Sequence, residues 1–345
     1  MNIQAKTNPD KGVQQIAPGI SRAEFQLNAN VTQLEQKGET LFAGLGNGQV
    51  VSVLGDAVTT VAAHSGAITA LTIDAQGAVY SAGQDGTIVR SLNGHRAVIH
   101  QTGGEWVNAM AVSPAGTRIA VAYGRSVVVF SGGQIVAKFD DHPSTVTGLA
   151  FAAGGNQIAA SRYNGVTLWS VEDLRKPENL TWAGSLTGLS VSPNDQYVAA
   201  ATQDREIHIW DLVSGRDFRL GGYQRKVKEF GWTDDGSYLF TSGADVMVAW
   251  GLAGDPGAIP PVEIGYAYSQ TVSAVAPTGT LYTMVGGFTD GSLVVGEARK
   301  GTAKIARGAD GASITGLTAS ACHRCFGFGT SAGVVGRISL DTALS

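Results

Sequence analysis

The sequence predicts an all-β protein made of repeated four-stranded sheets. Three observations carry this prediction. The same pattern recurs about every 40 residues, polar and apolar residues alternate within it, and no stretch has a convincing helical period. The chain of 345 residues contains 47 glycines without a Gly-X-Y period, which indicates many tight turns between short strands.

The repeat is clearest when residues 67–92 are aligned with residues 186–212. Both read as an alternating strand, a polar turn, a strand of small residues, an Asp-containing turn and another alternating strand. A unit of this length with four short strands is one blade of a β-propeller, and such blades must stack radially to bury their faces. The expected first strands begin at Val31, Ala67, Val107, Thr145, Leu186, Val227, Thr271 and Ser313.

The eight first strands predict eight blades, with seven as the alternative if the first or last unit packs irregularly. The last unit, residues 313–340, has room for only three strands. Residues 20–27 alternate suitably to supply the fourth strand from the N-terminal end, which would close the ring and remove exposed edges. We therefore expect a single propeller over residues 20–340, with tails at 1–19 and 341–345.

Several residues connect these units to a known family. Residues 207–211 end a third strand in Trp-Asp, and His64 and His142 precede their first strands with the same spacing. Through these residues the chain, over roughly residues 20–340, resembles the WD-repeat (WD40) β-propeller family as a divergent member.

The resemblance implies a hydrogen-bonded set within a blade, formed by His before the first strand, Ser or Thr in the second, Asp in the next turn and Trp in the third. The matching residues are His64, Ser81 and Asp85 in the second unit, His142, Ser161 and Trp169 in the fourth, and Asp204 and Trp210 in the fifth. No unit carries all four residue types. We expect these side chains to be structural, because buried polar groups need partners.

Composition and motifs argue against several classes of function. The net charge of −4 disfavours a chain-wide nucleic-acid role, and the chain has neither an apolar run long enough to span a membrane nor a signal-peptide core. We therefore expect a cytoplasmic protein, monomeric by itself and without membrane insertion. No P-loop, dinucleotide fingerprint or nucleophile elbow is present, so we expect neither an enzyme nor a cofactor.

The two cysteines form a Cys322-His323-Arg324-Cys325 motif at an expected strand turn. A C-x-x-C pair can bind Zn²⁺ or cycle redox, but a structural zinc site needs about four ligands and few are nearby. We expect two small apolar residues and no metal. Metal or redox chemistry at Cys322 and Cys325 stays open as an alternative.

In a propeller, each type of loop opens on one of the two faces of the ring. Connections from a fourth to a first strand and turns from a second to a third strand open on one face, called top, where aromatic and Arg side chains suit a protein interface. The candidates are Trp106, Tyr123, Arg125, Arg162, Tyr163, Trp182, Arg205, Tyr223, Arg225 and Lys226. Residues 216–228 add five Arg or Lys and one Asp, a local positive charge that would attract an acidic partner.

These features favour a protein-interaction scaffold. The top face would bind another protein, a subunit of a larger complex or an acidic peptide, and not a nucleic acid. The alternative is a propeller that handles a ligand or metal at an axial channel or at Cys322 and Cys325, with an enzyme ranked below it.

Overall fold

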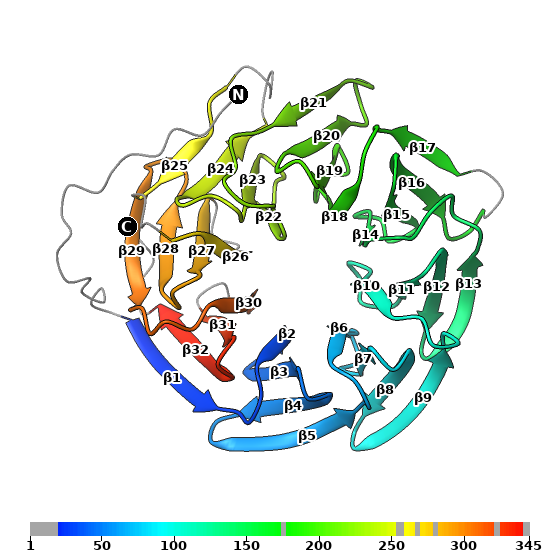
Figure 1. The fold of residues 1–345 in the computed structure, drawn as a ribbon, viewed down its shortest axis with the longest axis horizontal. Helices are drawn as coiled ribbons and strands as arrows, with labels where there is room; N and C mark the ends of the chain where they lie inside the picture. The colour runs from blue at the N-terminus through cyan, green and yellow to red at the C-terminus, as the bar shows by residue number, and fades with distance from the viewer. Residues whose placement is uncertain are drawn as a thin grey trace. The chain divides into compact units, whose positions relative to one another are not determined.

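The computed structural model describes residues 20–173, 177–252, 259–265, 270–278, 282–320 and 325–340. The tails predicted at 1–19 and 341–345 lie outside these ranges. Every regular element in the described ranges is a β-strand, and none of these residues forms a helix that could cross a membrane. The strands form eight four-stranded sheets (Figure 1). The fold is an eight-bladed β-propeller, which confirms the first prediction over the seven-bladed alternative.

Each blade takes four strands in chain order, except the last. Blade 1 is β2 (Val31–Lys37), β3 (Thr40–Leu45), β4 (Gln49–Leu54) and β5 (Ala57–Ala63); blade 2 is β6 (Ile68–Ile73), β7 (Val79–Gly83), β8 (Thr87–Leu92) and β9 (His95–Gln101); blade 3 is β10 (Val107–Val112), β11 (Ile119–Tyr123), β12 (Ser126–Ser131) and β13 (Gln134–Phe139); blade 4 is β14 (Gly148–Phe151), β15 (Gln157–Arg162), β16 (Gly165–Ser170) and β17 (Glu178–Thr181).

The second half of the chain continues the series. Blade 5 is β18 (Leu186–Val191), β19 (Tyr197–Thr202), β20 (Ile207–Asp211) and β21 (Asp217–Leu220); blade 6 is β22 (Phe230–Trp232), β23 (Tyr238–Thr241), β24 (Met247–Gly251) and β25 (Val262–Ile264); blade 7 is β26 (Val272–Pro277), β27 (Thr283–Phe288), β28 (Leu293–Glu297) and β29 (Thr302–Arg307); blade 8 is β30 (Ile314–Ala319), β31 (Cys325–Thr330), β32 (Val334–Leu340) and β1 (Ile20–Gln26).

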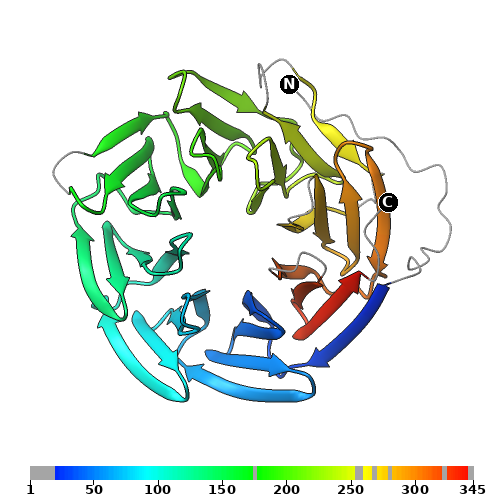
Figure 2. The ribbon, with the colours of Figure 1, turned by 180° about the vertical axis from the view of Figure 1, so that it is seen from behind.

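The N-terminal strand completes the last blade, as predicted. β1 pairs antiparallel with β32, from Ile20 opposite Leu340 to Gln26 opposite Val334, and the two strands lie side by side in both views (Figures 1 and 2). The buried side chain of Arg307, at the end of β29, bonds to Glu24 of β1 at 2.9 Å. β1 is therefore held to β32 by backbone bonds and to β29 by a side-chain bond.

In five blades the second strand is buried along its whole length. All residues of β7, β11, β19, β27 and β31 are buried, whereas the fourth strands β5 and β9 are mostly exposed. The small residues of these second strands let neighbouring blades approach. A Cβ placed on Gly286 would lie 2.6 Å from Met247 Sδ in blade 6, and one on Gly287 would lie 2.5 Å from Ile314 in blade 8. Glycine is therefore required where blade 7 packs between its neighbours.

Six first strands begin within one residue of the predicted position, but β14 and β22 begin three residues later. In blade 6 the reason is local. The N–H groups of Lys228 and Glu229 donate to Ser242 Oγ, at 3.0 and 3.1 Å, beside a single backbone bond from Ser242 N–H to the Glu229 carbonyl oxygen at 3.2 Å. This departure places Ser242 and Glu229 next to each other at one end of the blade.

Contact density divides the chain into two compact units. One takes in the residues up to 39, residues 204–208 and everything from 218 onwards; the other takes in residues 40–203 and 209–217.

Candidate binding site

The hydrogen-bonded set predicted in blade 2 forms. His64 Nε2 lies 2.9 Å from Ser81 Oγ, and His64 Nδ1 lies 3.2 Å from Asp85 Oδ1. Burial opposes ionisation of Asp85, but hydrogen bonds from Thr87, Ser65 and His64 outweigh it, so the pKa of Asp85 lies below its usual value. This Ser–His–Asp line has the order of a hydrolytic triad, but Ser81 is 0% exposed. The set therefore stabilises the blade and offers no nucleophile to a substrate.

Only the His–Trp part of the set forms in blade 4. Trp169 Nε1 donates to His142 Nε2 at 2.9 Å, and His142 Nδ1 donates to the Arg125 carbonyl oxygen at 3.0 Å. Burial lowers the pKa of His142, which suits this neutral tautomer. Ser161 instead pairs with Thr147 Oγ1 at 3.0 Å. All three predicted residues are structural, but Ser161 belongs to a separate interaction.

The two residues predicted for blade 5 do not meet. Trp210 Nε1 donates to the Thr181 carbonyl oxygen at 3.4 Å, whereas Asp204 is exposed in the turn before β20. Blade 5 has no His at the position that would connect them, so its Trp finds a backbone acceptor instead.

Blade 6 carries a set that the sequence analysis missed. Trp250 Nε1 donates to Tyr223 Oη at 2.6 Å, and Tyr223 Oη shares a hydrogen bond of 2.8 Å with Thr241 Oγ1. Burial raises the pKa of Tyr223 well above its usual value, so the hydroxyl stays neutral. Tyr223 precedes Val227 by four residues, the spacing of His64 to Ile68. That spacing was the available signal: Tyr223 occupies the histidine position.

Three residues predicted for the partner-binding face are buried, which corrects that prediction. Tyr123 is 7% exposed and its hydroxyl pairs with His100 Nε2 at 2.9 Å. Arg162 is 7% exposed and its Nε donates to Thr167 Oγ1 at 2.9 Å. Tyr223 belongs to the set above. Tyr123 and Arg162 are the last residues of β11 and β15, and all three side chains bond within the fold, so they are left out of the binding surface.

The other predicted residues reach solvent to different degrees. Trp106 is 57% exposed and Tyr163 56% exposed, whereas Trp182 is half-buried. The predicted cations Arg125, Arg205, Arg225 and Lys226 are exposed. Trp106, Tyr163, Trp182 and Arg125 belong to one compact unit, and Arg205, Arg225 and Lys226 to the other.

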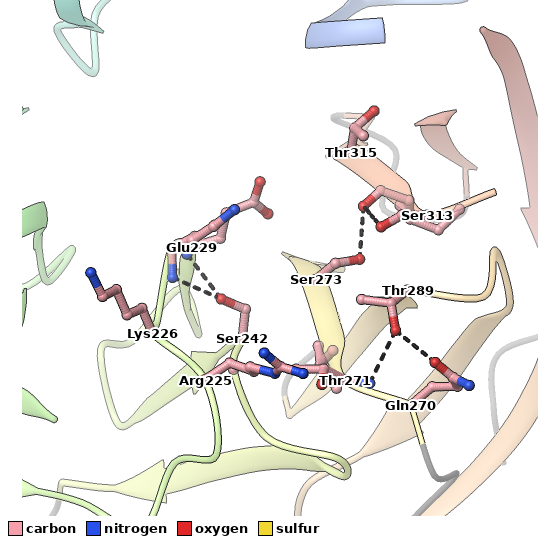
Figure 3. A pocket seen from close by; sticks show the side chains of 14 residues that line it. Arg225, Lys226, Glu229, Ser242, Gln270, Thr271, Ser273, Thr289, Ser313 and Thr315 are labelled. Carbon is pink, nitrogen blue, oxygen red and sulfur yellow. Dashed lines mark hydrogen bonds between the residues drawn. The ribbon is translucent and has the colours of Figure 1, made fainter. Parts of the chain in front are cut away.

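A pocket of about 630 Å³ lies where the ends of blades 6, 7 and 8 meet, within one compact unit (Figure 3). Its volume is in the range of ligand pockets. It is lined by Arg225, Lys226, Lys228, Glu229, Ser242, Gly243, Gln270, Thr271, Val272, Ser273, Thr289, Ser313, Ile314 and Thr315. These residues come from the segments before three first strands, from the beginnings of those strands and from the turns after two second strands. The loop types predicted to open on one face therefore do converge in this unit.

The pocket carries more positive than negative side chains. Arg225, Lys226 and Lys228 are exposed along its wall, and Glu229 is its one carboxylate among the described lining residues. Burial raises the pKa of Glu229 to about 7, against the opposing effects of a hydrogen bond from Val275 N–H and the charge of Lys228. The pocket is therefore cationic at neutral pH.

Hydroxyl groups supply most of the remaining polarity. Ser242 Oγ accepts two backbone N–H groups, which leaves its own proton available to a ligand. Thr315 Oγ1 is buried and finds no hydrogen-bond partner in the described part of the chain. A buried hydroxyl without a partner is costly, so this atom is one that a bound polar group could satisfy.

Sequence reasoning found only part of this pocket. Arg225 and Lys226 were predicted as binding residues, and Lys228 lay in the basic segment. Glu229 and the serines and threonines were not singled out, because small hydroxyl residues in loops resemble ordinary turn residues. Sorting loops by face was the signal that could have found them, had it been applied to hydroxyls as well as to aromatics.

The cysteine motif is described only at its second member. Cys325 begins β31, is buried, and accepts a hydrogen bond from Arg337 Nη2 at 3.3 Å. Cys322 lies outside the described residues. Within the described ranges, no three His, Cys, Asp or Glu side chains are grouped so that they could hold a metal ion.

Protein-family comparison gives two matches. The family described as "Lipoprotein LpqB beta-propeller domain" matches residues 10–140, and "WD domain, G-beta repeat" matches residues 133–170 and 179–211. Each WD match runs from the beginning of a fourth strand, β13 or β17, to the end of the next third strand, β16 or β20. The chain is thus similar to WD repeats at the Trp-bearing strands that suggested the family.

Curated relatives are similar over part of the chain. Small ribosomal subunit protein RACK1y of Oryza sativa subsp. japonica is 27% identical over 169 residues, which cover 44% of this chain and 49% of that protein. Pre-mRNA-processing factor 19 homolog 2 of Arabidopsis thaliana is 26% identical over 158 residues, covering 43% of this chain and 30% of that protein. The matched segments span half or less of each relative.

Solved structures share the fold. The computationally designed Ika8 protein has a TM-score of 0.70 at 20% identity, covering 91% of this chain and 97% of Ika8. A chain of the Mitotic Checkpoint Complex has a TM-score of 0.65 at 15% identity, covering 79% of this chain and 90% of that chain. At these identities the likeness concerns the fold alone.

Proposed function

We propose that this β-propeller, which is similar to WD repeats over residues 133–170 and 179–211, is a non-enzymatic scaffold that binds an acidic segment of a partner protein. The observation that carries the proposal is the cationic pocket at the ends of blades 6, 7 and 8. One similar protein supports the scaffold class, since it is named as a small ribosomal subunit protein.

The charge distribution favours an acidic partner. The whole chain has a net charge of −4, yet Arg225, Lys226 and Lys228 stand together beside the pocket. Opposite charges across an interface raise the association rate and suppress wrong partners. A segment rich in Asp or Glu would be attracted to this pocket and repelled by the acidic remainder of the surface.

Charge reversal at the pocket tests the proposal. Fluorescence anisotropy of a short labelled peptide of alternating Glu and Gly should report binding to the wild-type chain. We expect the Arg225→Glu/Lys226→Glu variant to bind at least about tenfold more weakly, because two attractions become repulsions. The signal should also weaken with added salt.

The matched control is Lys300→Glu/Lys304→Glu, which makes the same change in charge at two exposed residues outside the pocket. This variant should bind the peptide nearly as well as wild type. If both variants lose binding equally, or if neither does, the pocket is not the binding site and the proposal fails.

A further inference from the structure

The pocket contains an acidic side chain, Glu229, that attraction between opposite charges does not explain. Glu229 is a carboxylate in a pocket that otherwise suits anions. Figure 3 shows its carboxyl group pointing towards the side of the pocket formed by Ser273 and Thr315. A negative charge at this place would repel the acidic segment proposed above, so its presence needs a chemical explanation.

Glu229 is fixed in position from two sides. Its backbone N–H donates to Ser242 Oγ at 3.1 Å, and its Oε2 accepts the backbone N–H of Val275 in β26 at 3.0 Å. One carboxyl oxygen is thus used within the protein. The other is left for a ligand, to which it can donate a proton when the group is neutral.

We propose that Glu229 is a specificity residue: in its neutral, protonated form it binds a carboxylate of the partner. This inference rests on the proposed function. The protonated carboxyl of Glu229 donates a hydrogen bond to the Asp or Glu side chain of the partner, while Arg225 and Lys228 balance the partner's charge. Thr315 and Ser242 offer further hydroxyl donors in the same pocket. Binding therefore takes up one proton whenever Glu229 is ionised beforehand.

The charges around Glu229 agree with this role. Lys228 precedes it in the chain, and Arg225 and Lys226 come from the same segment. The groups that line the pocket from blades 7 and 8 are neutral: Gln270, Thr271, Ser273, Thr289, Ser313 and Thr315. Burial raises the pKa of Glu229 to about 7, so the proton can be taken up near neutral pH. No described histidine lines the pocket.

The same arrangement selects a carboxylate over a phosphate. One neutral acid and a few hydroxyls, all partly buried, can receive a single negative charge, whereas the cations stand along the exposed wall of the pocket. A dianionic phosphate would add charge beside Glu229 without a buried cation to balance it.

The test is peptide binding as a function of pH. If only the protonated form of Glu229 binds, the affinity of the wild-type chain for the Glu-Gly peptide should fall about tenfold between about pH 6 and about pH 8. Glu229→Gln keeps an oxygen for Val275 N–H and a donor for the ligand, so this variant should bind at the low-pH affinity throughout.

Glu35→Gln is the matched control. Burial also raises the pKa of Glu35 to about 7, but Glu35 lies in β2 and does not line the pocket. This variant should keep the wild-type pH profile. Thermal melting of each variant checks that it is folded.

The experiments distinguish failure of the Glu229 role from failure of the proposed function. A flat pH profile for wild type, an unchanged profile for Glu229→Gln, or tighter binding of a phosphoserine peptide than of the Glu peptide would overturn the role of Glu229. The proposed function would survive any of these results if Arg225→Glu/Lys226→Glu still loses binding. If Arg225→Glu/Lys226→Glu instead binds the peptide as tightly as wild type, the proposed function is overturned.

Discussion

At the scale of single residues, the repeat keeps its hydrogen-bond geometry while its residue types change. Blade 2 uses His64 between Ser81 and Asp85, and blade 6 uses Tyr223 between Thr241 and Trp250. In both cases a side chain that precedes the first strand bonds to a hydroxyl of the second strand and to one further group, which is Asp85 in the following turn or Trp250 in the third strand. The blade therefore requires a hydrogen-bonding side chain before its first strand, and either His or Tyr can provide it.

Removing the Tyr223 hydroxyl tests this interpretation. Tyr223→Phe leaves the Trp250 N–H and the Thr241 hydroxyl buried without that partner, which should cost about 1–3 kcal/mol of unfolding free energy. Urea denaturation followed by Trp fluorescence measures it. Peptide binding should not change, since Tyr223 is 5% exposed.

The control is a double-mutant cycle with Thr241→Val. This second change should cost less in the Tyr223→Phe background than in wild type, because the shared bond is already lost. Strictly additive effects would show that Tyr223 and Thr241 stabilise the blade independently, against the interpretation above.

At the scale of elements, the last blade depends on a strand from the other end of the chain. β1 supplies the backbone partner of β32 along its whole length, and its Glu24 pairs with Arg307 of β29. Arg307 also bonds to Asp310 at 2.6 Å, and its side chain is only 4% exposed. A buried guanidinium needs its carboxylate partners, so β1 is important to both blade 7 and blade 8.

Two truncations test the role of β1. Deleting residues 1–28 removes all of β1, and we expect a sharp fall in melting temperature, because β32 loses its partner and Arg307 loses Glu24. Deleting residues 1–18 leaves β1 intact and should change the melting temperature little. Differential scanning calorimetry of both chains provides the comparison, and equal effects would reject the account of blade 8.

The elements were more predictable from sequence than the site. Alternating residues, turns and the small-residue strands recur in every unit, so eight blades and the role of residues 20–26 could be read from one chain. The pocket combines residues as far apart as Arg225 and Ser313, and its hydroxyl residues are unremarkable in their own loops. Only folding brings them together, and only burial distinguishes Glu229 from a surface carboxylate.

At the scale of the whole molecule, an acidic protein carries a local excess of positive charge. The described residues of the pocket include three cations and one carboxylate whose pKa is raised by burial to about 7. The remaining exposed candidates, among them Trp106 and Tyr163, belong to the other compact unit.

The central claim is that a partner protein binds through this pocket, and a pull-down from native cell extract tests it most directly. The baits are wild type, Arg225→Glu/Lys226→Glu and Lys300→Glu/Lys304→Glu, each shown to be folded. We predict that wild type and the Lys300→Glu/Lys304→Glu variant capture a protein with an acidic segment, and that the Arg225→Glu/Lys226→Glu variant does not. Excess Glu-Gly peptide should displace this protein from both baits that capture it. Partners that all three baits retain equally, and that the peptide does not displace, would contradict the account.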